Sequence, residues 1–150
     1  LTLCATTAFM GPPSLWGDRA KLVEEKGMGA VADATIDRWF TPSGQARLPQ
    51  AIGDLRATLL NTPVAGYSAC CQAIMGMDQR EGVTAIRTPT HVMVGELDPS
   101  TPVAASEFLR DAIPGATLTV IPDSMHLFNV EQVTEFNTAL LDFLARHRAT

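Results

Sequence analysis

Basic residues are scarce in this 150-residue chain, which has 11 Lys and Arg against 16 Asp and Glu and a net charge of −5. Nor do the basic residues cluster, so the sequence offers no electrostatic footprint for nucleic acid or for an anionic membrane surface. We therefore expect neither a nucleic-acid partner nor a membrane partner. With 46% hydrophobic and 18% charged residues, the chain can bury a core as one domain or a large part of one.

Cysteine is also rare. Cys4, Cys70 and Cys71 are the three cysteines, and the adjacent pair gives no disulfide framework, which fits a reducing compartment and predicts a cytoplasmic location. The uncharged stretch that opens the chain, residues 1–17, contains a Gly-Pro-Pro triplet at 11–13 that would break a membrane-spanning helix. Because no basic region precedes this stretch, we expect neither a transmembrane segment nor a signal peptide.

The pattern of apolar and polar residues changes twice along the chain. Residues 1–14 open with an apolar run at 1–6 that fits a buried strand, although a buried helix has the same pattern, and end in the Gly-Pro-Pro loop. Residues 15–86 carry apolar side chains at three- and four-residue spacings, for example over 28–40, which indicates short amphipathic helices. Residues 87–150 read as alternating strands and helices.

This last part predicts a parallel arrangement. We expect strands at 91–95 and 116–121, a helix from 101 to about 113 with Thr101 as its N-cap, and a final helix from about 131 to 147. The order strand–helix–strand–helix favours a parallel sheet with crossover helices, which is an α/β fold. Only three strands are predicted in the chain, too few for a well-covered parallel sheet.

The two loops that follow the later strands carry the best candidates for chemistry. Asp98 follows the strand at 91–95, and His126 follows the strand at 116–121. Functional residues of open parallel sheets gather beyond the carboxyl ends of the strands, so we expect these two side chains to be hydrogen-bonded. A carboxylate that holds one imidazole nitrogen while the other accepts a proton is the general-base half of a catalytic triad.

Other interpretations of these loops are open. Asp98 taken alone could cap the helix that follows it, and His126 taken alone could be an ordinary loop residue. Glu96 and Asp123 are rival acids. Glu96 could point back over the sheet edge, and Asp123 lies so close before His126 that a backbone turn contact suits it better. We prefer Asp98 as the acid.

The segments around Asp98 and His126 resemble the acid and histidine segments of the α/β-hydrolase family. They read Val-Gly-Glu-Leu-Asp at 94–98 and Asp-Ser-Met-His-Leu-Phe-Asn-Val-Glu-Gln at 123–132. Narrower segments resemble 3-oxoadipate enol-lactonases, in particular their helical cap: Trp-Phe-Thr-Pro at 39–42, Val-Ala-Gly-Tyr-Ser-Ala-Cys-Cys at 64–71, and Leu-Cys-Ala-Thr-Thr-Ala at 3–8 followed by Leu-Trp at 15–16. The resemblance covers essentially the whole chain.

The resemblance implies the C-terminal portion of an α/β-hydrolase fold plus a helical cap. Residues 1–14 would be a core strand and loop, residues 15–86 the cap, and residues 87–150 the C-terminal core that carries the acid and the histidine. The implied activity is hydrolysis of a small carboxylated enol-lactone, a substrate class of the bacterial breakdown of aromatic compounds.

The resemblance also implies roles for single residues. Asp98 and His126 would serve a Ser-His-Asp mechanism that needs no metal and no organic cofactor. Trp16 begins the cap directly after the first strand's loop, so a substrate-binding role and plain cap packing are both open for it. Trp39 is expected in the core of the cap.

In one respect the chain departs from this family. Its six serines, at positions 14, 43, 68, 100, 106 and 124, all lie outside a Gly-x-Ser-x-Gly motif. The resemblance therefore implies that the nucleophile and the oxyanion-hole donors belong to an N-terminal half of the same fold, which we expect as a partner. The chain alone is expected to be inactive. A non-catalytic small-molecule binding module, or a related esterase or perhydrolase, is the alternative.

Ser68 mimics the missing nucleophile. It lies in Gly-Tyr-Ser-Ala-Cys at 66–70 and precedes Asp98 and His126 in the family's order. The segment before it, 61–65, contains a proline and is too short for the central strand that a nucleophile needs. We therefore expect Ser68 to be structural.

The remaining candidates are weaker. His91 and His147 show no metal-ligand spacing with Cys or a carboxylate. Cys70 and Cys71 are expected to be buried, inert thiols.

Overall fold

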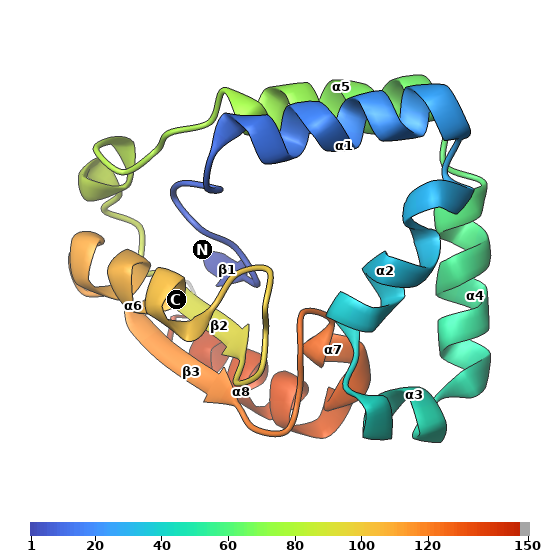
Figure 1. The fold of residues 1–150 in the computed structure, drawn as a ribbon. Coiled ribbons are helices and arrows are strands. Elements are labelled where there is room, and N and C mark those ends of the chain that lie inside the picture. The colour runs from blue at the N-terminus through green and yellow to red at the C-terminus, as the bar shows by residue number, and fades with distance from the viewer. Residues whose placement is uncertain (148–150) are drawn as a thin grey trace.

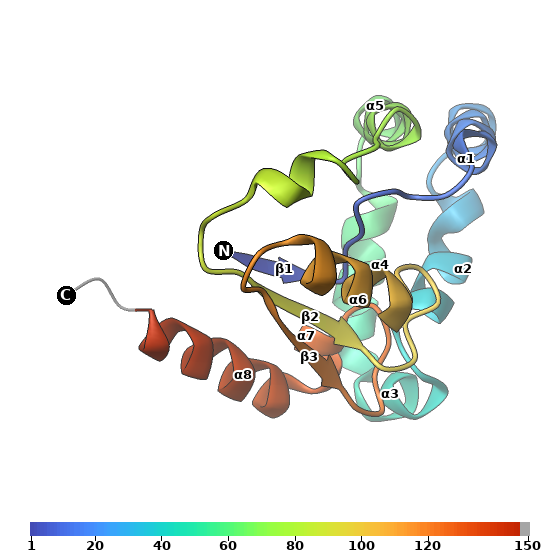
Figure 2. The same ribbon diagram turned by 90° about the vertical axis from the view of Figure 1, so that its left-hand side faces the viewer.

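The computed structural model of the chain describes residues 1–147, and its core is a small parallel sheet. Strands β1 (Thr2–Cys4), β2 (His91–Gly95) and β3 (Thr117–Ile121) lie in the order β1-β2-β3 (Figure 2). Leu3 pairs with Val92, and Val92 pairs with Leu118. The predicted α/β fold with parallel strands is confirmed.

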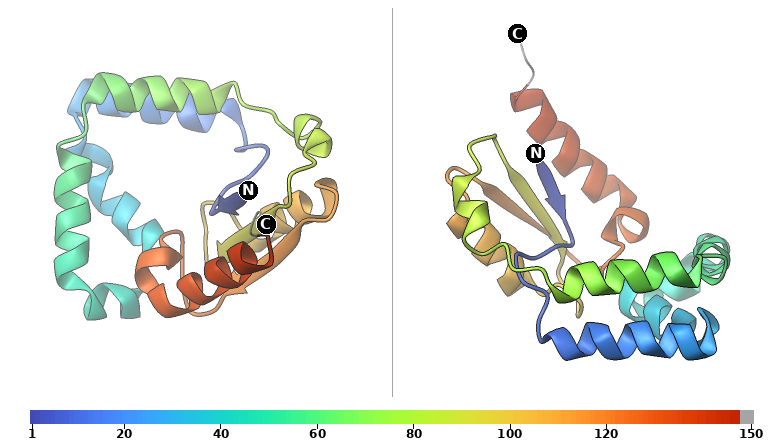
Figure 3. Two further views of the ribbon diagram at one scale, coloured as in Figure 1. Left: turned by 180° about the vertical axis from the view of Figure 1, so that it is seen from behind. Right: turned by 90° about the horizontal axis from the view of Figure 1, so that it is seen from above.

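Helices cover both faces of this sheet. Successive side chains of a strand point to opposite faces, so the apolar strand β2 has buried side chains on each face. Val92 points toward α6 (Val103–Ala112), where it packs with Leu109. Met93 points the other way, into a cluster with Phe128 and with residues of α8 (Val133–Arg146). Figures 2 and 3 show α6 and α8 on opposite sides of the strands.

A second layer consists of helices contributed by the first half of the chain. They are α1 (Pro13–Lys26), α2 (Gly29–Trp39), α3 (Pro42–Arg47), α4 (Pro49–Leu60) and α5 (Val64–Met75), followed by the short 3-10 helix η1 (Gly82–Ala85). Helices α1 and α5 run side by side along one edge of the molecule, and α2 and α4 line the next edge (Figure 1). We call α1–α5 the cap.

The cap has its own apolar core. Val23, Met28, Val31, Ala32 and Leu59 are buried together where α1, α2 and α4 meet. Proline stands in the first turn of α1, α3 and α4, where its missing N–H leaves no intrahelical bond unmade. The domain boundaries expected from the sequence stay a prediction, and α1 begins two residues before the expected start of the cap.

The structure corrects three element boundaries. The first strand ends at Cys4 because Ala5 adopts a φ of +44°, which turns the chain out of the extended conformation. The final helix, α8, begins at Val133, and a separate short helix, α7 (Phe128–Glu131), precedes it; Gln132 lies between them with a non-helical φ of −127° and ψ of 61°. Strand β3 begins one residue later than predicted, at Thr117.

The predicted N-cap at Thr101 is wrong. Helix α6 begins at Val103 after Pro102, and neither this proline nor Thr101 caps the helix through a side chain. The Thr101 hydroxyl donates instead to Asp98 Oδ2, at 2.6 Å. A charged acceptor next to it therefore outcompetes the helix end for this hydroxyl.

One edge of the sheet has no partner within residues 1–147. Strand β1 pairs only with β2, so the backbone of its other side is unpaired in the described part of the chain.

Helices able to cross a bilayer are absent from residues 1–147, since none is both long and apolar enough.

Candidate active site

The acid loop and the histidine loop pass each other at the ends of β2 and β3. Leu97 N donates to Ser124 O at 2.9 Å, which ties the two loops together. Gly95, the last residue of β2, makes this approach possible. A Cβ at Gly95 would lie 2.2 Å from Met125 O and 2.7 Å from Ser124 O, distances at which the backbone of the histidine loop would have to move.

Asp98 and His126 are joined by a hydrogen bond. His126 Nδ1 lies 2.8 Å from Asp98 Oδ2, and the side chain of Asp98 is fully buried while that of His126 is 21% exposed. The predicted contact is therefore present, in the range that general-base catalysis requires.

The Asp98 carboxylate is held by further donors. Its Oδ1 accepts the backbone N–H groups of Ser100 at 2.8 Å and Thr101 at 3.1 Å, and its Oδ2 also accepts the Thr101 hydroxyl. Burial alone raises the pKa of Asp98, but the hydrogen bonds from His126 and Thr101 outweigh it and hold the pKa below its ordinary value. The acid is thus ionised at neutral pH.

This arrangement fixes the tautomer of His126. An ionised carboxylate only accepts hydrogen bonds, so Nδ1 of His126 must carry a proton, and in the neutral imidazole the lone pair is then on Nε2. Asp98 thus orients the imidazole through Nδ1, and Nε2 is the nitrogen available to accept a proton. Such a pair can accept a proton at Nε2 while the nearby negative charge stabilises the imidazolium.

The rival acids take other roles. Glu96 Oε2 accepts the backbone N–H of Asp123 at 3.2 Å, so these two residues contact each other across the loop tips. Within residues 1–147 neither of them forms a hydrogen bond with His126. Of these three acids, Asp98 is the one whose side chain is hydrogen-bonded to His126 in the described part of the chain.

Sequence reasoning missed one buried acid, Glu131. Its Oε2 accepts the backbone N–H of Met125 at 3.0 Å, and its Oε1 accepts the backbone N–H of Thr41 at 3.0 Å as well as the Thr41 hydroxyl. On the other side of His126, Leu127 N donates to Trp39 O at 3.0 Å. The histidine loop is therefore fastened to the end of α2 and the start of α3 on both sides of the imidazole.

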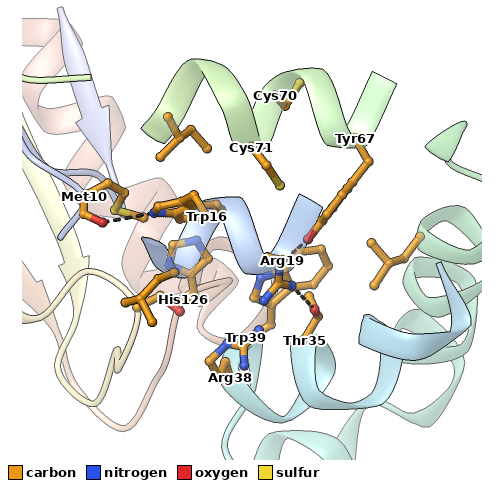
Figure 4. Close-up of a pocket in the computed structure, with 14 residues that line it drawn as sticks. Met10, Trp16, Arg19, Thr35, Arg38, Trp39, Tyr67, Cys70, Cys71 and His126 are labelled. Carbon is orange, nitrogen blue, oxygen red and sulfur yellow. Dashed lines mark hydrogen bonds between the residues drawn. The ribbon is translucent and has the colours of Figure 1, made fainter. Parts of the chain in front are cut away.

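A pocket of about 570 Å³ opens in front of His126, between the cap and the core (Figure 4). This is the size of an ordinary small-molecule site. The cap supplies most of its wall, and Ser100 and His126 supply the part on the core side. The lining residues are Met10, Leu15, Trp16, Arg19, Thr35, Arg38, Trp39, Leu59, Tyr67, Cys70, Cys71, Ile74, Ser100 and His126.

Trp16 lies in this pocket wall, near His126 in Figure 4. Its indole N–H donates to Met10 O at 3.0 Å, which fixes the ring against the loop that follows β1. Trp39, expected in the cap core, contributes to both places: it packs against the buried apolar cluster of the cap and also lines the pocket.

The expectation for the adjacent cysteines holds for only one of them. Cys71 is buried, and burial raises the pKa of its thiol. Cys70 is exposed, because neighbouring positions of a helix point about 100° apart and only one can face the α1 side.

Ser68 lies away from His126. It is buried on α5, where its hydroxyl contacts the carboxylate of Glu24 on α1, and it is absent from the residues that line the pocket. Ser100 does line the pocket, yet within residues 1–147 no hydrogen bond joins it to His126.

The other histidines lie outside the pocket. His91 is buried, with Nδ1 2.7 Å from Thr117 Oγ1 and its ring stacked on Phe143. Burial, and then the charge of Arg146, lower the pKa of His91. His147 packs against the same phenylalanine. The described residues contain no group of three His, Cys, Asp or Glu side chains that could hold a metal ion.

Comparison with known proteins agrees with this geometry. No protein-family model matches the chain. It is 36% identical over 135 residues to 3-oxoadipate enol-lactonase 2 of Acinetobacter baylyi, covering 90% of this chain and 50% of the relative. For 3-oxoadipate enol-lactonase 1 of the same organism the identity is 30% over 136 residues, covering 91% and 51%.

Solved structures of an enol-lactonase and of an esterase are similar to this chain as well. The enol-lactonase of Burkholderia xenovorans LB400 superimposes with a TM-score of 0.93 and 34% identity, covering 96% of this chain and 55% of that one. A thermophilic esterase from Thermogutta terrifontis, solved with malate bound, gives a TM-score of 0.89 and 29% identity, covering 97% and 55%.

The parallel sheet and these relatives show that the chain has part of an α/β-hydrolase fold and is homologous to proteins of the α/β-hydrolase superfamily. Within that superfamily it is similar to the 3-oxoadipate enol-lactonases, as its sequence motifs imply. The chain spans about half the length of the curated relatives it matches.

Proposed function

We propose that this chain supplies the acid, the base and the cap of a Ser-His-Asp hydrolase that opens a small carboxylated enol-lactone. The observation that carries the proposal is the buried Asp98 bonded to His126 Nδ1, with His126 in the wall of a small-molecule pocket. The serine and the oxyanion-hole donors would come from an N-terminal half of the fold outside these 150 residues.

The proposed chemistry needs only protein groups. His126 Nε2 takes the proton of the serine hydroxyl as the serine oxygen attacks the lactone carbonyl. The ring C–O bond then breaks, and His126 returns the proton to the departing enol oxygen. In the second half, His126 Nε2 takes a proton from water, the hydroxide releases the acyl group as a carboxylic acid, and the serine regains its proton. Asp98 keeps the imidazole oriented and stabilises its charged form.

Three observations support the substrate class. The two curated relatives are named as 3-oxoadipate enol-lactonases, and the pocket volume suits a molecule of that size. The T. terrifontis esterase was solved with malate, itself a carboxylate.

The free cysteines Cys4 and Cys70, both exposed, support a cytoplasmic location, which is part of the proposal.

The test supplies the proposed N-terminal half. The N-terminal half of an A. baylyi enol-lactonase, carrying Gly-x-Ser-x-Gly, is fused ahead of Leu1 or added as a separate chain. We expect hydrolysis of 3-oxoadipate enol-lactone by the assembly and none by the 150-residue chain. Hydrolysis by the chain alone, abolished by Ser68→Ala, would overturn the proposal.

A non-catalytic binding module is the second candidate, and it is favoured by the absence of a nucleophile motif from a chain that still forms a pocket. The same fusion separates the two. A properly folded fusion that binds the lactone without consuming it would favour the binding module. Turnover would favour the hydrolase.

A further inference from the structure

Two arginines from different cap helices enter the pocket that His126 lines. Arg19 comes from α1 and Arg38 from α2, and both are half-buried in its wall (Figure 4). Most of the remaining wall is apolar and includes Leu59 and Ile74. Two guanidinium groups in an otherwise apolar pocket need a counter-charge.

Arg19 is held rigidly, but only by neutral groups. Its Nε donates to the Tyr67 hydroxyl at 2.5 Å and its Nη2 donates to Thr35 Oγ1 at 2.6 Å. The guanidinium also lies 5.7 Å from the centre of the Tyr67 ring. These contacts use two of its five N–H donors, so the group is oriented while its charge is not neutralised.

Arg38 has even fewer partners. Within residues 1–147 it makes no side-chain hydrogen bond and no salt bridge. Burial, and then the positive charge of Arg19, lower the pKa of Arg38, so the two cations repel each other. Tyr67 and, to a smaller extent, the Asp37 carboxylate offset this only in part, and Asp37 is exposed and accepts a hydrogen bond from Gln45 at 3.3 Å.

Two other acids of the cap are engaged elsewhere. Asp33 pairs with Arg56 on the outside of the cap at 2.8 Å, and Glu24 contacts the Ser68 hydroxyl. Carboxylates are absent from the residues that line this pocket, whereas two cations and His126 are present. A pocket wall of one sign concentrates ligands of the opposite sign.

We propose that Arg19 and Arg38 form a subsite for the carboxylate of the ligand. The subsite selects small anionic esters or lactones over their neutral analogues, with the reacting carbonyl left toward His126. The role of His126 rests on the proposed function, but the carboxylate subsite does not require a nucleophile.

Tryptophan fluorescence can report ligand binding in this pocket. Trp16 and Trp39 are the two tryptophans of the sequence, and both line the pocket. The 150-residue chain is titrated with 5-oxooxolane-2-acetate, a saturated carboxylated lactone, and with its uncharged primary amide, while tryptophan emission is recorded. We expect saturable binding of the carboxylate and at least about tenfold weaker binding of the amide.

Matched variants locate the charge that matters. Arg38→Gln removes the cation without breaking a hydrogen bond in the described structure, and it is expected to weaken carboxylate binding by about 10- to 100-fold while leaving the weak binding of the amide unchanged. Arg38→Lys should retain most of the affinity. Arg56→Gln, on the outer face and paired with Asp33, is the control and should bind like the parent.

The result that overturns the subsite is equal binding of carboxylate and amide, or equal loss in the Arg38→Gln and Arg56→Gln variants. Circular dichroism and melting establish that each variant is folded. Where the chain alone does not melt cooperatively, the same titration is run on the fusion with its motif serine changed to alanine.

The two proposals fail in different ways. Selective carboxylate binding without turnover by the fusion that retains its motif serine would leave the subsite standing and refute the hydrolase. Turnover of neutral and anionic lactones at equal kcat/KM would leave the hydrolase standing and refute the subsite.

Discussion

The core side and the cap side of the pocket are built by different means. On the core side, Asp98 and His126 sit on short loops at the ends of adjacent parallel strands, and the backbone of the sheet dictates their meeting. On the cap side, Arg19 and Arg38 meet because helices from separate stretches of chain pack together. The first kind of site follows from strand order, and the second depends on packing in three dimensions.

The largest expected effect lies on the core side and concerns the acid. In the fusion that supplies the serine, Asp98→Asn would leave an amide opposite Nδ1 and favour the wrong tautomer of His126. We expect kcat to fall by about 10⁴-fold with the fold unchanged. Steady-state kinetics on the lactone measure this. A loss below tenfold would mean that Asp98 is not the triad acid.

A second test asks how tightly the two core loops are fitted. Gly95→Ala puts a Cβ against the backbone of the histidine loop, and we expect it to lower the free energy of unfolding by about 2 kcal/mol or more. Gly53→Ala on α4 is the control, because a Cβ there meets nothing within 4 Å, and it should be neutral or stabilising by up to about 1 kcal/mol. Chemical denaturation gives both values. Similar values for both variants would contradict the close approach.

A third test concerns the link between the two sides. Glu131→Gln leaves one acceptor oxygen where the carboxylate serves both Thr41 and Met125, so one donor is left unpaired. We expect a cost of about 1–3 kcal/mol in stability and, in the fusion, a lower kcat with little change in KM.

The matched control for that test is Glu135→Gln on the exposed side of α8. It should change neither quantity measurably. A rise in KM alone for Glu131→Gln would show that Glu131 shapes the pocket rather than the position of the histidine loop.

The smallest effect is a pH dependence of stability on the core side. The pKa of Asp98 is lowered in the folded state, so its ionised form stabilises the fold above the unfolded pKa of about 3.9, and that contribution disappears as the pH falls through the folded value. Asp98→Asn should therefore lose the part of the acid-side decline that the parent shows below about pH 4. Identical pH profiles for the two would refute the depressed pKa.

Much of the core side could be predicted from the sequence. The strands around Val92 and Leu118, the helix after Pro102 and the bond between Asp98 and His126 follow from periodicity and from strand order. The error at Thr101 has a physical cause, since a threonine before a proline suits a helix cap but the buried carboxylate binds its hydroxyl first.

The cap side could be predicted only as helices. Glu131 accepts hydrogen bonds from Thr41, 90 positions earlier in the chain, and no local pattern marks that contact. Arg19 and Arg38 look like ordinary surface cations of amphipathic helices until α2 and α5 are packed against α1. The prediction that Cys70 is buried is wrong, because which face of α5 is covered depends on that same packing.

The central claim is that His126, held by Asp98, activates a serine from outside this chain. Labelling of the fusion with a fluorophosphonate, followed by mass mapping of the adduct, tests it most directly. The account predicts an adduct on the serine of Gly-x-Ser-x-Gly, formed rapidly in the parent and at least about 10³-fold more slowly in His126→Ala. An adduct on Ser68, or labelling of the motif serine at the same rate without His126, would contradict it.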